Sequence, residues 1–272
     1  MQEISIINIS RTLSDDEISA ALPNLQAQVS QHFAPAWAAD ATLVQEPRNS
    51  MPSPDSWWLV ILDDSDQADA LGYHDMTPSY MPLGKVFART DRESGHTWTV
   101  TASHELLEML ADPWLNRVAP DLRDPNNPVF YAYEICDACQ VDQLGYRIND
   151  TLVSNFVYPK WFEPNRNVSG PFDFLKLIER PLQVLPGGYI GIFEPRLGWR
   201  QYNGTASTKQ FASDPSVSRQ LTVRVGSRRD RRLRKYLGFD LQTSKPGKGE
   251  NRRPGTIADI VSGMCLALIE PN

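Results

Sequence analysis

The sequence predicts an α+β protein, with a mixed sheet and packed helices first and a β-rich part after them. Three observations support this. Short apolar runs have the length of strands, two amphipathic segments have helical spacing, and glycine-bounded aromatic runs follow Pro113. Over residues 1–112 the expected order is strand, helix, strand, strand, strand, helix, an order consistent with helices lying on one sheet.

The bulk composition limits the class of protein. The 272 residues are 41% hydrophobic, which is enough for a substantial core, and the net charge of −6 makes nucleic acid an unlikely main partner. Three cysteines disfavour a disulfide framework. With no secretory signal and no membrane-length apolar run, we expect a cytoplasmic protein without a membrane partner. Composition leaves its oligomeric state open.

The first two predicted elements are a strand and a capped helix. Residues 3–9 contain four isoleucines and are typical of a strand. Ser14 followed three residues later by Glu17 is a capping box, and apolar residues at helical spacing continue to Phe33. Pro23 is expected to kink or restart this helix.

Three further strands and a second helix complete the first part. Residues 41–45 form a plausible strand, and the continuous apolar run 57–62 suits a central buried strand. Residues 84–89 are expected to form another strand, at an edge of the sheet. Residues 101–113 then form a helix that stops at Asp112-Pro113.

Beyond Pro113 the sequence favours short strands. The aromatic run 129–136 is followed by a hairpin, residues 146–156, that turns at Asn149-Asp150. Residues 189–194 and 199–202 are expected to be two more strands. We divide the chain into a domain of residues 1–203 and a C-terminal extension of residues 204–272, which contains a polar linker and a final apolar element.

The second helix contains the string HExxE, formed by His104, Glu105 and Glu108. The i, i+4 spacing places His104 and Glu108 on one helix face, where both can hold one metal ion. Glu105 then lies beside the ion as a candidate general base. The alternative interpretation is an ordinary amphipathic helix whose acidic face is solvated.

A catalytic zinc usually has three protein ligands, so a third is expected elsewhere. The best candidate is Glu134, because a carboxylate in an apolar aromatic run is costly to bury without a partner. Asp137 is a candidate fourth ligand, or a group that orients the His104 ring. An ion pair between Glu134 and an arginine is the alternative.

These segments resemble a zincin metallopeptidase, closest to the gluzincins, in which a downstream Glu completes an HExxH motif. The resemblance spans roughly residues 1–200 and implies a zincin-like mixed sheet with an active-site helix. It implies that His104 is the first ligand, Glu105 the general base and Glu134 the third ligand. Glu108 departs from the pattern, since a histidine is expected there. This more anionic ligand set favours zinc less selectively and admits another divalent ion.

The expected function is a metal-dependent hydrolase, most plainly a zinc metallopeptidase acting on a peptide or protein substrate. Tyr73 and His74 are candidates for stabilising the oxyanion, and His74 is also a candidate ligand. The alternative function is a catalytically inactive protein of the same fold that serves as a binding or structural module.

Two other patterns are weaker signals. Cys136 and Cys139 form a single CxxC, which is expected to be a pair of buried or unpaired thiols rather than a redox or structural-metal site. The basic run at residues 228–235 is expected to be a solvated face or loop. Its alternative role is a patch for phosphate, nucleic acid or an acidic partner chain.

Overall fold

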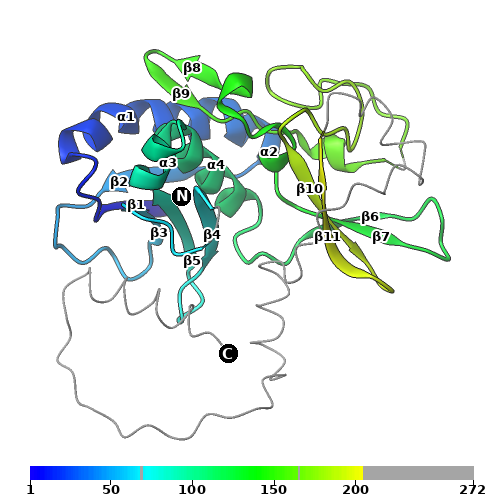
Figure 1. Cartoon of the computed structure of the whole chain (residues 1–272), viewed down its shortest axis with the longest axis horizontal. Helices are drawn as coiled ribbons and strands as arrows, with labels where there is room; N and C mark the ends of the chain where they lie inside the picture. The colour runs from blue at the N-terminus through cyan, green and yellow to red at the C-terminus, as the bar shows by residue number, and fades with distance from the viewer. Residues whose placement is uncertain (68–69, 165, 205–272) are drawn as a thin grey trace, which may run out of the picture.

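The protein was analysed as a computed structural model that describes residues 1–67, 70–164 and 166–204. Its centre is a five-stranded sheet of order β2-β1-β3-β5-β4 (Figure 1). The strands of this sheet are β1 (Gln2–Asn8), β2 (Ala41–Gln45), β3 (Trp57–Leu62), β4 (Gly72–Met76) and β5 (Pro82–Phe87). The α+β class is therefore confirmed.

Strand β4 was not predicted, and it corrects the position assigned to the next strand. Residues 84–89 were expected at an edge, but β5 lies between β3 and β4, and each of its residues is buried. The edge is β4, which runs antiparallel to β5 while the other pairs are parallel. Strand propensity alone does not reveal β4, because three of its five residues, Gly72, His74 and Asp75, are of types that do not favour strands.

The first helix begins as expected but passes through its proline. Helix α1 (Asp15–Ala27) has a complete Ser14–Glu17 capping box. Pro23 lies inside α1, so the helix does not restart at that residue. The winding changes later, in the π-helix η1 (Gln28–Phe33), which α2 (Ala34–Trp37) follows. Burial of this helix's apolar face outweighs the one hydrogen bond that Pro23 cannot donate.

One face of the sheet packs on the helices. Helix α4 (Trp98–Ala111), preceded by the short α3 (Ala88–Glu93), lies against β4 and β5. Figure 1 shows α1, α3 and α4 on the same side of the sheet. Leu59, Ile61 and Val86 of the sheet share a buried core with Leu106 and Leu110 of α4.

A second sheet follows α4, with the order β11-β10-β7-β6 and all its pairs antiparallel. Its strands are β6 (Val118–Asp121), β7 (Val129–Ala132), β10 (Tyr189–Glu194) and β11 (Gly198–Asn203). The predicted hairpin is present as β8 (Tyr146–Ile148) and β9 (Thr151–Val153), joined at Asn149-Asp150. Three short 3₁₀ turns complete the described elements: η2 (Asp137–Cys139), η3 (Asp142–Leu144) and η4 (Pro159–Phe162). The β-rich second part is therefore confirmed.

Several predictions fall outside the described residues. These are the basic run at residues 228–235, the final apolar element and all but the first residue of the extension assigned to residues 204–272. Within the described ranges, none of the helices combines the length and apolar character that crossing a membrane requires.

Candidate metal centre

Helix α4 is buried on all sides, including its acidic face. Every residue from Thr99 to Ala111 is buried, and the Glu108 side chain is 0% exposed. The solvated-face interpretation of the HExxE helix is therefore wrong. Burying a carboxylate is costly unless the protein or a ligand compensates its charge.

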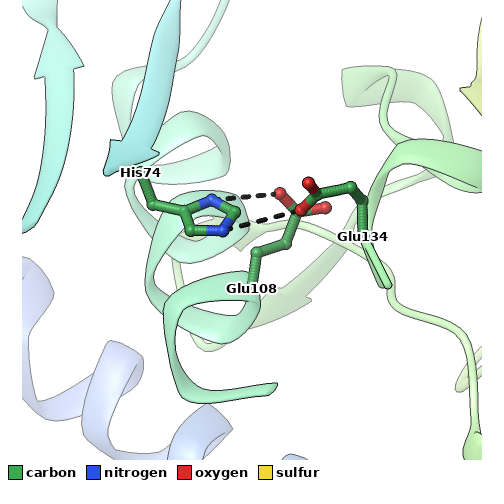
Figure 2. A group of neighbouring side chains, drawn as sticks. All are labelled: His74, Glu108 and Glu134. Atoms are coloured by element: carbon green, nitrogen blue, oxygen red, sulfur yellow. Dashed lines mark ion pairs between the residues drawn. The ribbon is translucent and has the colours of Figure 1, made fainter. Parts of the chain in front are cut away.

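Strand β4 directs His74 at this face of α4. Its ring Nδ1 lies 3.4 Å from Glu105 Oε2 and 3.5 Å from Glu108 Oε2, and its Nε2 lies 3.6 Å from Glu134 Oε2. Figure 2 shows the His74 ring facing the carboxylates of Glu108 and Glu134, which both lie on one side of it. One ligand atom from each of His74, Glu108 and Glu134 lies within 4.8 Å of the other two.

Glu134 lies near His74 and Glu108 because it is on the segment that follows β7. This segment is fixed by backbone hydrogen bonds, in which Val157 N–H donates to Ile135 O (2.8 Å) and Leu185 N–H donates to Ala138 O (2.9 Å). Cys136 N–H donates to Glu108 Oε1 at 3.0 Å. That bond ties the segment to α4 and holds the Glu108 carboxylate in one orientation.

His104 lies on the other side of Glu108. Its Nε2 is 3.3 Å from Glu108 Oε1 and 3.2 Å from Asp137 Oδ1, and Asp137 opens the turn η2. His104, Glu108 and Asp137 form a second set whose ligand atoms lie within 4.8 Å of one another. The two sets share Glu108.

Burial and like charge dominate the protonation of this region. Burial raises the pKa of Glu108, and the carboxylates of Asp137 and Glu134 raise it further, against the opposing effect of His104. For His104, burial alone would lower the pKa, but Glu108 and Asp137 outweigh it and raise the pKa well above 6.5. Both raised pKa values favour the protonated forms of His104 and Glu108.

The structure brings six of the seven sequence-predicted site residues together. We call them the carboxylate–histidine cluster: His74, His104, Glu105, Glu108, Glu134 and Asp137. The seventh, Tyr73, points from the opposite face of β4, where its hydroxyl bonds with Asp66 and with the buried Lys85. Its expected role at the oxyanion has no geometric support there. Strand alternation separates Tyr73 from His74, and this could be inferred only once β4 was known to be a strand.

Gly72 of β4 allows α4 to approach the sheet closely. A Cβ placed on Gly72 would lie 2.6 Å from Thr101 Cγ2 and 3.0 Å from Glu105 Cγ, and one on Gly84 would lie 3.7 Å from Glu105 Cβ. Gly84 is the register partner of His74. The absence of a side chain at Gly72 lets Glu105 lie against the sheet beside His74, whereas a Cβ on Gly84 would meet Glu105 at an ordinary contact distance and would instead clash with Leu59 Cδ1 at 2.6 Å.

Asp91 of α3 is a buried acid that the sequence did not single out. Its side chain accepts a hydrogen bond from Thr101 Oγ1 at 2.8 Å, and the residue is 0% exposed. Burial, with smaller contributions from Asp142 and Glu105, raises the pKa of Asp91 to about 7. Among the charged residues of its own segment, Asp91 gives no sequence signal of burial.

Asp91→Asn is expected to make the metal-free protein more stable above pH 7. A raised acid pKa contributes stability that is full below about pH 4 and is lost as the pH rises through about 7. Asparagine resembles the neutral acid, so the gain at pH 8 should be about 1–4 kcal/mol, at about 1.4 kcal/mol per pKa unit. Urea unfolding at pH 5 and pH 8 measures the difference, with the exposed Asp55→Asn as a control. Equal destabilisation by Asp91→Asn at both pH values would contradict the predicted gain in stability.

Cys136 and Cys139 are free, buried thiols. Burial is the main cause that raises the pKa of both well above 9, so they stay protonated. This agrees with the expectation of buried, unpaired cysteines. The part of Cys136 that contacts the cluster is its backbone N–H.

No family model, curated protein or solved structure matches the chain.

Proposed function

We propose that the protein is a metal-dependent hydrolase, most plainly a zinc-dependent or other divalent-metal peptidase with zincin-like chemistry. The metal ligands are His74, Glu108 and Glu134. The observation that supports this proposal is Glu108 Oε2, which is fully buried and has no hydrogen-bond partner among the described residues. It faces an imidazole at 3.5 Å, and two atoms bound to one ion at about 2.0–2.2 Å lie at most about 4.4 Å apart.

The ligand set fits a divalent ion. One imidazole and two carboxylates suit zinc and harder divalent ions alike. An ion takes one nitrogen of His74, which leaves the other nitrogen to donate to a neighbouring carboxylate, an arrangement that fixes the ring. Cys136 N–H performs the corresponding task for Glu108, because it holds one carboxylate oxygen in place.

When bound, the ion supplies a Lewis acid and makes a coordinated water more acidic. Glu105 would be the residue that accepts a proton from the attacking water and returns it to the leaving amine. Its Oε2 lies 3.4 Å from His74 Nδ1, beside the proposed ion. The least buried side chains of the cluster are those of His104 and Glu134, at 10% and 11% exposed, so a peptide carbonyl is expected to approach from that side.

The test is a metal titration of chelator-treated protein, followed by hydrolysis of unfolded protein substrates. The chelator-treated wild type should bind Zn²⁺ or another divalent ion tightly, and the loaded protein should cleave the substrates whereas the apoprotein should not. His74→Ala should lose binding by about 100-fold or more, since loss of even an outer partner of a ligand costs about 10–100-fold. The matched control is His96→Ala, which removes an exposed histidine from the turn after α3. Protein that takes up no ion overturns the proposal.

Near-complete burial favours a second candidate, a structural metal site in a non-catalytic module. The side chains of His74 and Glu108 are 0% exposed, and closed sites are typical of structural metals. In that case the loaded protein binds metal and is stabilised by it, but cleaves nothing, and Glu105→Gln changes no activity.

A further inference from the structure

We propose that the carboxylate–histidine cluster holds a pair of divalent cations, with Glu108 as the carboxylate that bridges them. The second ion would be held by His104, Glu108 and Asp137. This inference rests on the proposed function, because the first ion is the one assigned to His74, Glu108 and Glu134.

The orientation of Glu108 supports a bridge. Its Oε1 lies 3.3 Å from His104 Nε2, whereas its Oε2 lies 3.5 Å from His74 Nδ1. Each oxygen of one carboxylate therefore faces a different imidazole. Cys136 N–H donates to Oε1, but a carboxylate oxygen has a second lone pair for an ion.

Each oxygen of Glu108 also has its own third ligand. Glu134 Oε2 lies 3.6 Å from His74 Nε2 on one side, and Asp137 Oδ1 lies 3.2 Å from His104 Nε2 on the other. Each triad thus combines one imidazole and two carboxylates, and the two triads are separate apart from Glu108. Two ions bridged by one carboxylate lie about 3.5–4 Å apart, the spacing used by two-metal hydrolases.

The charge of the cluster also favours two ions. Its four carboxylates, Glu105, Glu108, Glu134 and Asp137, carry −4 when ionised, and both imidazoles must be neutral to bind metal. One divalent ion leaves −2 among these buried groups, and two reduce the sum to zero. Uncompensated buried charge is the costlier state.

The inference is tested by counting and observing ions in the full chain. Chelator-treated protein is loaded with Mn²⁺ alone, freed of excess ion, and measured by elemental analysis and by electron paramagnetic resonance. We expect two ions per chain and a magnetically coupled spectrum in place of the six-line signal of isolated Mn²⁺. His104→Ala and Asp137→Asn should each retain one ion with the six-line signal, and His96→Ala should retain the coupled pair.

The outcomes separate the two proposals. One Mn²⁺ per chain in the wild type, or none, overturns the pair, whereas the proposed function is overturned only if the separate titration with Zn²⁺ and other divalent ions also shows no uptake. Two ions without magnetic coupling overturn the bridge through Glu108. These measurements use the wild type, so they decide the matter even if a variant fails to fold.

Discussion

Glu105→Gln is expected to lower kcat for hydrolysis by about 10²–10⁴-fold while the protein keeps its metal, the range that a general base contributes. Glutamine has nearly the same shape and preserves an oxygen 3.4 Å from His74 Nδ1, but it does not accept a proton at neutral pH. The change therefore removes the proton transfer and leaves the ligands in place. Steady-state kinetics and elemental analysis of the same loaded sample measure both quantities.

The control for Glu105→Gln is Glu93→Gln, which neutralises an exposed glutamate at the end of α3. It should retain wild-type kcat and metal content. If Glu105→Gln hydrolyses as fast as the wild type, Glu105 is not the base. If the Glu105→Gln protein instead loses its metal together with its activity, Glu105 is a ligand and not the base.

Glu108→Gln is expected to weaken metal binding by about 100-fold or more, because Glu108 is a proposed direct ligand and even outer-shell partners contribute about 10–100-fold. The amide oxygen of the glutamine can still accept the hydrogen bond from Cys136 N–H, so the segment that carries Glu134 and Asp137 should stay in place. The other atom becomes an N–H₂ group that cannot bind a cation. Calorimetric titration with Zn²⁺ measures the loss.

The same substitution should stabilise the metal-free protein, and this second result separates an electrostatic effect from misfolding. Burial and neighbouring carboxylates raise the pKa of Glu108, so its charge is unfavourable in the metal-free fold, and an amide removes that charge. Thermal unfolding of both apoproteins at pH 8 provides the comparison. A Glu108→Gln protein that binds Zn²⁺ as tightly as the wild type would contradict its role as a ligand.

Much of the fold follows from local patterns in the sequence. The capping box at Ser14, the apolar run 57–62 and the turn at Asn149-Asp150 each predict an element that the structure contains. The failures are also local. Strand β4 has too few apolar residues to be recognised, and Pro23 is tolerated because tertiary burial of α1 outweighs one missing hydrogen bond.

The sequence predicts which residues belong to the candidate site, but not how their side chains face one another. Helical spacing places His104 and Glu108 together, and the cost of burying Glu134 indicates that it has a partner. The division into two triads could not be predicted, because it depends on which oxygen of Glu108 faces which histidine. Nor could the inward direction of His74, which depends on the pairing of β4 with β5.

Glu134 follows β7, a strand of the second sheet, and this position affects how fast the protein is degraded in the cell. His74 and Glu134 are sixty positions apart (134 − 74), so their side chains meet only after the two sheets have docked. An ion bound there stabilises the docked state by about 2.7 kcal/mol when free metal is 100 times Kd. Chains made under metal starvation should therefore open between the sheets more often and be degraded faster by proteases. Metal supply would set the abundance of the protein as well as its activity.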